Sequence, residues 1–163
     1  MTTMPKDLRP SELVELDDVD RALVRLLRAD GRMANRELAD RVGIAPSTCH
    51  GRVRRLVEIG VIRGFFADID PAAVGQTLRA MVAVSLQSDA RGQIRHFVGQ
   101  IRHREEIIDV FFLAGTDDYL LHVAVPDTQA LREFVETLNS RPEVAGTTTS
   151  LVFEHVRAAA PVF

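Results

Sequence analysis

The apolar residues of this chain change their spacing near Gly60. Before Gly60 they recur every three or four positions, which is typical of amphipathic helices. After residue 77 they alternate along short segments, which is typical of strands half-buried in a sheet. A chain of 163 residues is long enough for one ordinary domain or two small ones. We therefore predict an α+β chain whose two halves are built from different elements.

Three short helices are predicted before Gly60. Each is bounded by residues that favour helix ends, either a polar N-cap or a proline at the first position and then a glycine after the last turn. The predicted first and last bounding residues are Asp17 and Gly31, Asn35 and Gly43, and Pro46 and Gly60. The tight glycine turn between the second and third helices predicts a helix-turn-helix. The alternation from Val61 to Ile69, broken at Gly64, predicts a two-stranded wing.

The third helix has the polar face that a DNA-reading helix needs. Cys49, Val53 and Leu56 are predicted to form its buried stripe, and the opposite side of its first turns is polar. Such positions reach base edges in helix-turn-helix proteins, and arginine suits guanine and phosphate contacts. The predicted DNA-binding residues are Ser47, Thr48, Gly51, Arg52, Arg54, Arg55 and Arg63.

The local charge agrees with this prediction although the whole chain carries a net charge of −3. Between Ser47 and Arg63 the arginines are opposed by one acid, Glu58. A basic stripe on a neutral region can mark a DNA footprint, but a solvated helix face explains it equally well. Arg52 flanks the buried stripe, so an internal salt bridge is as good an explanation of it as a DNA contact.

The second half of the chain predicts a ferredoxin-like βαββαβ domain. The expected strand, helix, strand, strand, helix and strand are Leu78–Leu86, Arg91–Arg102, Ile107–Ala114, Tyr119–Val125, Thr128–Ser140 and Val144–Glu154. This order gives a four-stranded antiparallel sheet with its helices on one face. The predicted regions are an arm (1–16), the helix-turn-helix domain (17–64), a strand and linker (65–77), the ferredoxin-like domain (78–156) and a tail (157–163).

One face of that sheet has no cover within the domain. Both alternate sets of its first and third strands are rather apolar. Large apolar patches mark interfaces, so we expect two copies to pair face to face. The alternative is that the N-terminal domain folds over the same face.

Several classes of protein and site are not expected. No apolar run approaches the about 20 residues of a membrane span, and the polar N-terminus does not look like a signal peptide, so we expect a cytoplasmic protein. Cys49 is the single cysteine and is expected in the core. His96 and His103 lack a third metal ligand. Asp117-Asp118 and Glu105-Glu106 lack an accompanying nucleophile. We predict no catalytic residue, no metal and no cofactor.

From Leu16 to Val156 the chain resembles the Lrp/AsnC family, the feast/famine transcription regulators of bacteria and archaea. The segment that resembles the family's first two helices is LDDVDRALVRLLRADGRMANRELADRVGIA. The family's recognition helix, wing and linker are resembled by PSTCHGRVRRLVEIGVIRGFFADIDPAAVG. The turn of its effector domain and the strand that follows are resembled by AGTDDYLLHVAV.

The resemblance implies a transcription factor that binds double-stranded DNA and senses an amino acid or related metabolite with its C-terminal domain. It also implies dimers formed through the C-terminal sheets, which assemble further to tetramers or octamers. The effector is expected at Gly115, Thr116, Asp117, Asp118 and Tyr119. A zwitterion needs an anion for its ammonium and N–H donors for its carboxylate, and a glycine turn with two acids offers both. Asp118 as a simple turn cap is the compatible alternative.

The turn departs from the family pattern in one respect. The glycine is usually followed by an acid or similar polar residue and then often by an aromatic, whereas this chain has Thr116 and Asp117. The departure bears on which effector is preferred. The alternative function is a nucleoid-type architectural protein that wraps DNA without a small-molecule effector. An enzyme or metabolite-binding subunit is disfavoured because no nucleophile–base constellation is present.

Overall fold

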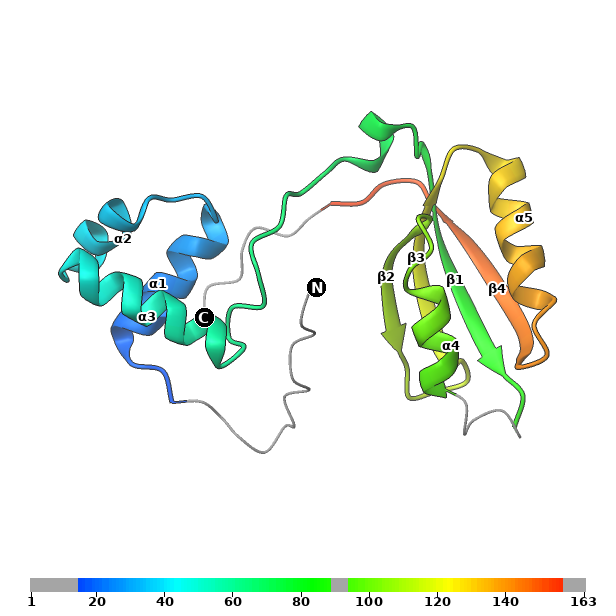
Figure 1. Cartoon of the computed structure of the whole chain (residues 1–163). Helices are drawn as coiled ribbons and strands as arrows, with labels where there is room; N and C mark the ends of the chain where they lie inside the picture. Colours follow the sequence, from blue (N-terminus) through cyan, green and yellow to red (C-terminus); the bar gives the residue numbers. More distant parts are fainter. Residues whose placement is uncertain (1–14, 89–93, 157–163) are drawn as a thin grey trace. The chain divides into compact units, whose positions relative to one another are not determined.

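The computed structural model describes residues 15–88 and 94–156, with the side chains of 94–96 excepted. The predicted arm over residues 1–14, the start of the helix predicted from Arg91, and the predicted tail at 157–163 lie outside the described residues. The chain divides into two compact units, one ending at Asp68 and the other spanning Ile69–Val156 (Figure 1). Each unit is built around its own apolar core.

The N-terminal unit contains three helices, α1 (Asp18–Ala29), α2 (Asn35–Val42) and α3 (Pro46–Glu58) (Figure 1). Their apolar faces meet in one small core, whose buried members are Leu23, Leu27, Leu38, Ala39, Cys49 and Leu56. The predicted cap at Asp17 is confirmed, because its Oδ1 accepts the N–H of Asp20 at 2.7 Å. Gly43 ends α2 in the left-handed region at φ +71°, which glycine adopts at little cost.

One predicted helix boundary is wrong by one residue. Ala34, not Asn35, is the N-cap of α2, and it offers no side-chain hydrogen bond. The amide of Asn35 instead donates to the carbonyl of Pro46 at 2.8 Å, which ties the start of α2 to the start of α3. The end of the first helix is as predicted, because Asp30 is its C-cap and Gly31 follows directly after it.

The predicted two-stranded wing is absent from residues 61–70, which contain neither strand nor helix. Phe66 lies against Gly64, where an added Cβ would come within 2.5 Å of its ring. Phe65, Phe66 and Ile69 are exposed. A two-stranded ribbon is marginally stable unless further strands or a helix support it, and the described segment shows no such pairing.

The C-terminal unit has the predicted βαββαβ order. After a short 3-10 helix (Pro71–Val74), its elements are β1 (Leu78–Leu86), α4 (Ile94–Ile101), β2 (Ile107–Phe112), β3 (Tyr119–Val125), α5 (Thr128–Asn139) and β4 (Val144–Val152). The strands pair antiparallel in the order β2-β3-β1-β4, so the ferredoxin-like prediction is confirmed. β2 and β4 each end two residues earlier than predicted.

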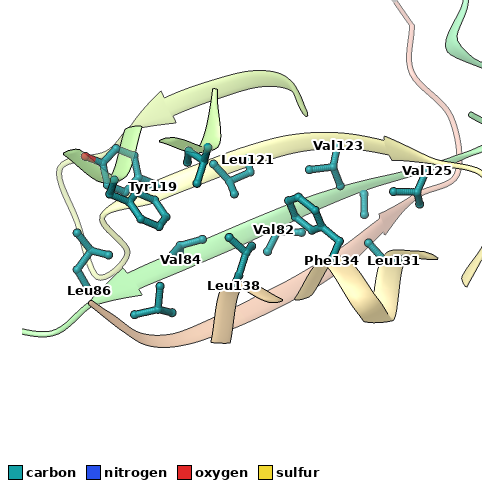
Figure 2. Packing of buried hydrophobic residues seen from close by; sticks show 14 residues of the cluster. Val82, Val84, Leu86, Tyr119, Leu121, Val123, Val125, Leu131, Phe134 and Leu138 are labelled. Atoms are coloured by element: carbon teal, nitrogen blue, oxygen red, sulfur yellow. The ribbon is translucent and has the colours of Figure 1, made fainter. Parts of the chain in front are cut away.

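The structure shows which alternate set of residues is buried. Ala80, Val82 and Val84 of β1 lie in one core with Leu121 and Val123 of β3. The same core contains Phe97 and Ile101 of α4, so α4 and α5 cover the same face. Figure 2 shows Leu131, Phe134 and Leu138 of α5 packed over the strands. Asp127 caps α5 as predicted, because its Oδ1 accepts the N–H of Ala130 at 2.9 Å.

The other alternate set faces away from these helices. We call it the open face, and it carries Met81 and Ala83 of β1, Leu120 and His122 of β3, and Phe111 of β2. Strand pairing places these residues side by side, since Met81 is opposite His122, Ala83 is opposite Leu120, and Phe111 is opposite Leu120. None of the five is fully buried within this unit. This face is the apolar patch that the sequence predicted.

Candidate DNA interface and effector turn

The start of α3 presents small and polar side chains to solvent. Pro46 occupies the first turn, and its fixed φ and missing N–H suit that position. Ser47, Thr48 and Gly51 are exposed. A Cβ added at Gly51 would meet no atom within 4 Å, so the space beside it is open. This surface can approach a groove wall or a phosphate closely.

The arginines of α3 are paired with carboxylates. Arg52 donates through Nη1 to Asp17 Oδ2 at 2.6 Å and to Asp20 Oδ1 at 2.9 Å. Arg55 donates to Asp20 Oδ2 at 3.2 Å. The structure therefore contains the internal salt bridge that the sequence left as an alternative for Arg52. The salt bridge does not test the predicted contact of Arg52 with DNA. Arg52 would have to make that contact through the N–H groups that Asp17 and Asp20 leave available.

Arg54 and Arg63 are placed differently. Arg54 forms an ion pair with Glu58 one turn later at 2.7 Å, and both side chains are mostly exposed. This contact raises the pKa of Arg54 above its ordinary value through the hydrogen bond to Glu58. Exposed pairs of this kind are weak and exchange readily with water or phosphate. Arg63 is exposed beyond the end of α3.

Asp20 is the residue of this site that the sequence analysis missed. It is 2% exposed and is the one buried polar or charged residue in the described part of the chain. A signal was present, since Asp20 lies three and seven positions before Leu23 and Leu27 and so falls on the buried face of α1. An acid on such a face needs a charged partner. The sequence does not show which arginine supplies it.

The neighbouring carboxylate, Asp17, is held in its ionised form. The hydrogen bond from the backbone N–H of Asp20, followed by that from Arg52, lowers the pKa of Asp17 below its ordinary value. In turn, the hydrogen bonds from Arg52 to Asp17 and Asp20 raise the pKa of Arg52. The cluster formed by Asp17, Asp20, Arg52 and Arg55 joins the start of α1 to the middle of α3. We call it the α1–α3 cluster.

A hollow of about 1020 Å³ opens beside this cluster. The two arginines of the cluster line it together with Thr48 and Gly51 of α3, and the start of α1 supplies the opposite wall. The full lining is Glu15, Leu16, Asp17, Asp20, Arg21, Thr48, Gly51, Arg52 and Arg55. The predicted DNA-facing residues of α3 therefore share one depression with their carboxylate partners.

Four of the predicted effector residues lie between β2 and β3, and the fifth, Tyr119, is the first residue of β3. Gly115 and Thr116 are exposed. Asp118 Oδ2 accepts the backbone N–H of Leu86 at 2.7 Å, and its own N–H donates to the carbonyl of Val84 at 3.0 Å. Asp117 Oδ1 accepts the hydroxyl of Ser85 at 2.9 Å. Both carboxylates thus hold the turn against the end of β1, a turn-capping role of the kind that the sequence left open for Asp118.

Tyr119 is mainly a core residue. It is 1% exposed, and its ring lies 5.4 Å from the rings of both Phe97 and Phe112. Figure 2 shows it at the same end of the core as Leu86. Burial raises the pKa of the Tyr119 hydroxyl, and the neighbouring Asp118 carboxylate adds to the effect. The second carboxylate oxygens of Asp117 and Asp118 have no partner among the described residues. Two acids and an exposed glycine turn therefore lie together at the end of β1, with two carboxylate oxygens available to a ligand.

Among the residues that the structure describes, no three His, Cys, Asp or Glu side chains are placed to hold a metal ion. No described helix has the length and apolar character needed to cross a bilayer. Cys49 is buried, and burial raises the pKa of its thiol.

Each of the two units matches a known family of domains. Residues 16–63 match a model described as winged helix-turn-helix DNA-binding, and residues 79–162 match the Lrp/AsnC ligand binding domain. The chain belongs to the Lrp/AsnC family. It is 63% identical over 158 residues to the HTH-type transcriptional regulator AldR of Mycobacterium tuberculosis, covering 96% of this chain and 87% of the relative. It is 38% identical to the leucine-responsive regulatory protein of Escherichia coli K12, with 88% of each chain covered.

Solved structures of this Lrp/AsnC family agree with the fold. The crystal structure of MtbAldR, at 59% identity, superposes with a TM-score of 0.74 over 90% of this chain and 100% of that one. A Neisseria meningitidis transcriptional regulator in complex with L-Met, at 31% identity, gives a TM-score of 0.81 over 91% of this chain and 96% of that one. This Lrp/AsnC protein is a transcriptional regulator with a DNA-binding helix-turn-helix and a ligand-binding domain.

Proposed function

We propose that this protein recognises specific DNA sequences and that an amino acid or related small metabolite controls its DNA affinity or its assembly. One observation carries the proposal. A single chain combines the exposed polar start of α3 with a ligand-binding domain whose 115–118 turn presents two carboxylates. A ligand can shift such a protein between states only if it binds one of them better.

The DNA contacts are assigned to the first turns of α3. Helix-turn-helix proteins place the N-terminal residues of the recognition helix against base edges in the major groove. Ser47, Thr48 and Gly51 are exposed there, with Arg55 one turn beyond Gly51. Arg54, Arg52 and Arg63 are assigned to phosphate contacts, which position the protein without reading sequence. Arg54 is the best suited because Glu58 is an exposed partner that it can leave.

The effector is assigned to the turn at Gly115, Thr116, Asp117, Asp118 and Tyr119. Its ammonium group would contact the carboxylate oxygens of Asp117 and Asp118 that do not accept from Ser85 and Leu86. Its carboxylate would accept N–H groups of the glycine turn. The relative crystallised with L-Met and the relative named leucine-responsive support an amino acid as the class of effector. Neither identifies the one that this chain prefers.

Pairing of two copies is assigned to the open face. Phe111, Leu120, Ala83 and Met81 lie side by side there, and an apolar surface of this kind favours an interface. Two helix-turn-helix units carried by one dimer would read two half-sites spaced by turns of the duplex. We extend the proposal to tetramers or octamers built from such dimers, with the effector biasing one assembly over another.

A thermal-shift screen of the purified chain tests this proposal. The standard amino acids and their 2-oxo acids are added singly, and light scattering records the assembly state. A ligand present at 100 times its dissociation constant should add about 2.7 kcal/mol of stability, which is easily detected. A hit that also changes assembly or DNA affinity supports the proposal. A flat screen with intact DNA binding would instead favour an architectural DNA-wrapping protein.

A further inference from the structure

The α1–α3 cluster contains a buried charge that the fold alone does not call for. Asp20 occupies an otherwise apolar face of α1, beside Leu23 and Leu27 in the core. Removing a carboxylate from water is costly, and an apolar residue at such a position often stabilises a protein better than an ion pair does. A carboxylate kept there needs a reason other than stability.

The geometry points to that reason. Each oxygen of Asp20 accepts from a different arginine of α3, Oδ1 from Arg52 and Oδ2 from Arg55. These arginines are three positions apart on one helix, so their like charges would otherwise drive the side chains apart. The carboxylate between them fixes both guanidinium groups relative to the helix axis.

Arg55 remains able to bind a ligand while it is held. Its side chain is half exposed and contacts Asp20 through Nη1 alone. A guanidinium has five N–H donors, so Nε and Nη2 are left without a partner among the described residues. Those nitrogens belong to a side chain that lines the hollow beside Gly51. The pair of Arg54 with Glu58 differs, because both of its members are exposed and nothing buried anchors them.

We propose that Asp20 is a positioning residue for DNA recognition, holding Arg55 in the orientation in which it reads sequence. This inference rests on the proposed function, since it requires α3 to be the reading helix. It adds a residue of α1 that touches no DNA and acts through Arg55. Asp17 takes no part in this orientation, because it pairs with Arg52 and caps α1 but does not contact Arg55.

The test distinguishes three possible effects of Asp20 on DNA binding: orientation of Arg55, stability of the fold, and the negative charge of its carboxylate. A duplex is selected by the wild-type chain from a random-sequence pool, and affinities are measured for it and for an unrelated duplex. Asp20→Asn is expected to lower the ratio of the two affinities about tenfold, as expected for loss of one good base contact. Its affinity for the unrelated duplex should stay equal or rise, because a negative charge near DNA is removed. Asp17→Asn, which removes a neighbouring carboxylate and keeps the cap, should leave the ratio unchanged.

A double-mutant cycle with Arg55→Ala completes the experiment. If Asp20 acts through Arg55, Asp20→Asn should change the ratio less than about twofold in the Arg55→Ala background. Equal loss in both backgrounds, or equal changes in affinity for the two duplexes, would overturn the inference. If Asp20→Asn is not folded at the assay temperature by circular dichroism, Asp20→Glu replaces it, since it keeps the charge and displaces the carboxylate. A wild-type chain that selects no sequence would overturn the proposed function as well.

Discussion

The carboxylate of Asp118 accepts the backbone N–H of Leu86 at 2.7 Å. This bond ties the turn before β3 to the last residue of β1, and Leu86 is buried. The predicted effector turn is therefore held by its own acidic residue before any ligand arrives. Any ligand that contacts Asp118 would act on the end of the central strand β1, which pairs with both β3 and β4.

Two substitutions at Asp118 separate its structural and ligand roles. Asp118→Ala leaves the N–H of Leu86 without its acceptor, and we expect the free energy of unfolding to fall by about 1–3 kcal/mol. Asp118→Asn keeps an acceptor oxygen and removes the charge, so it should cost less. Both should abolish the thermal shift caused by the effector. If Asp118→Asn responds fully to the effector, the ligand binds elsewhere.

Arg55→Ala should weaken binding to the selected duplex about tenfold. The melting temperature should change little, because Asp20 keeps its hydrogen bond from Arg52. Fluorescence anisotropy gives the affinity and a thermal melt gives the stability. Arg132→Ala on α5, which removes another exposed arginine, should leave both unchanged. An unaltered affinity together with a lower melting temperature would show that Arg55 is purely structural.

The ion pair of Asp17 predicts a specific acid sensitivity. The folded state lowers the pKa of Asp17 below 3.8, first through the N–H of Asp20 and then through Arg52. Such a group contributes stability above the unfolded pKa and loses it as the pH falls through the lowered folded value. Asp17→Asn keeps a good N-cap but has no such proton linkage.

The measurement is the melting temperature of wild type and Asp17→Asn at a series of pH values. Wild type should be the more stable at neutral pH, and the difference should shrink as the pH falls below 3.8. A difference that stays constant across the series would show that the ion pair with Arg52 does not contribute to stability.

Leu120→Glu tests the open face. Leu120 lies between Ala83 and Phe111 in the strand register, so a charge there would be buried by face-to-face pairing. Light scattering should show a shift toward monomer, with far-ultraviolet circular dichroism unchanged. Thr128→Glu adds the same charge at the first turn of α5, where the helix dipole tolerates it, and should leave assembly intact. An unchanged mass for Leu120→Glu would place the interface elsewhere.

Much of the fold was predictable because local rules governed it. Asp17, Pro46 and Asp127 occupy helix starts for reasons that depend on their immediate neighbours. The alternation in β1 and β3 predicted both strands with their observed bounds. Asn35 was misplaced because its amide bonds to Pro46, eleven positions away, and local preference does not show such a partner.

The site was less predictable, because its contacts join distant parts of the chain. Arg52 and Asp17 are 35 positions apart, and their contact depends on how α1 crosses α3. The same crossing decides that Asp20 is shared by two arginines. Likewise, the sequence predicted that Asp117 lies in the turn but not that its carboxylate accepts from Ser85. Residue type and spacing predicted these surfaces, and tertiary packing decided which of their side chains are paired within the chain.

The central claim is that one chain couples a small ligand to DNA binding. The most direct measurement is a titration of the wild-type chain with its selected duplex, without ligand and with the amino acid or 2-oxo acid that raises its melting temperature most. Coupling between such sites is typically about 1–3 kcal/mol, so we predict a change in affinity of about fivefold or more. Affinity and assembly that are identical with and without the bound ligand would contradict the account.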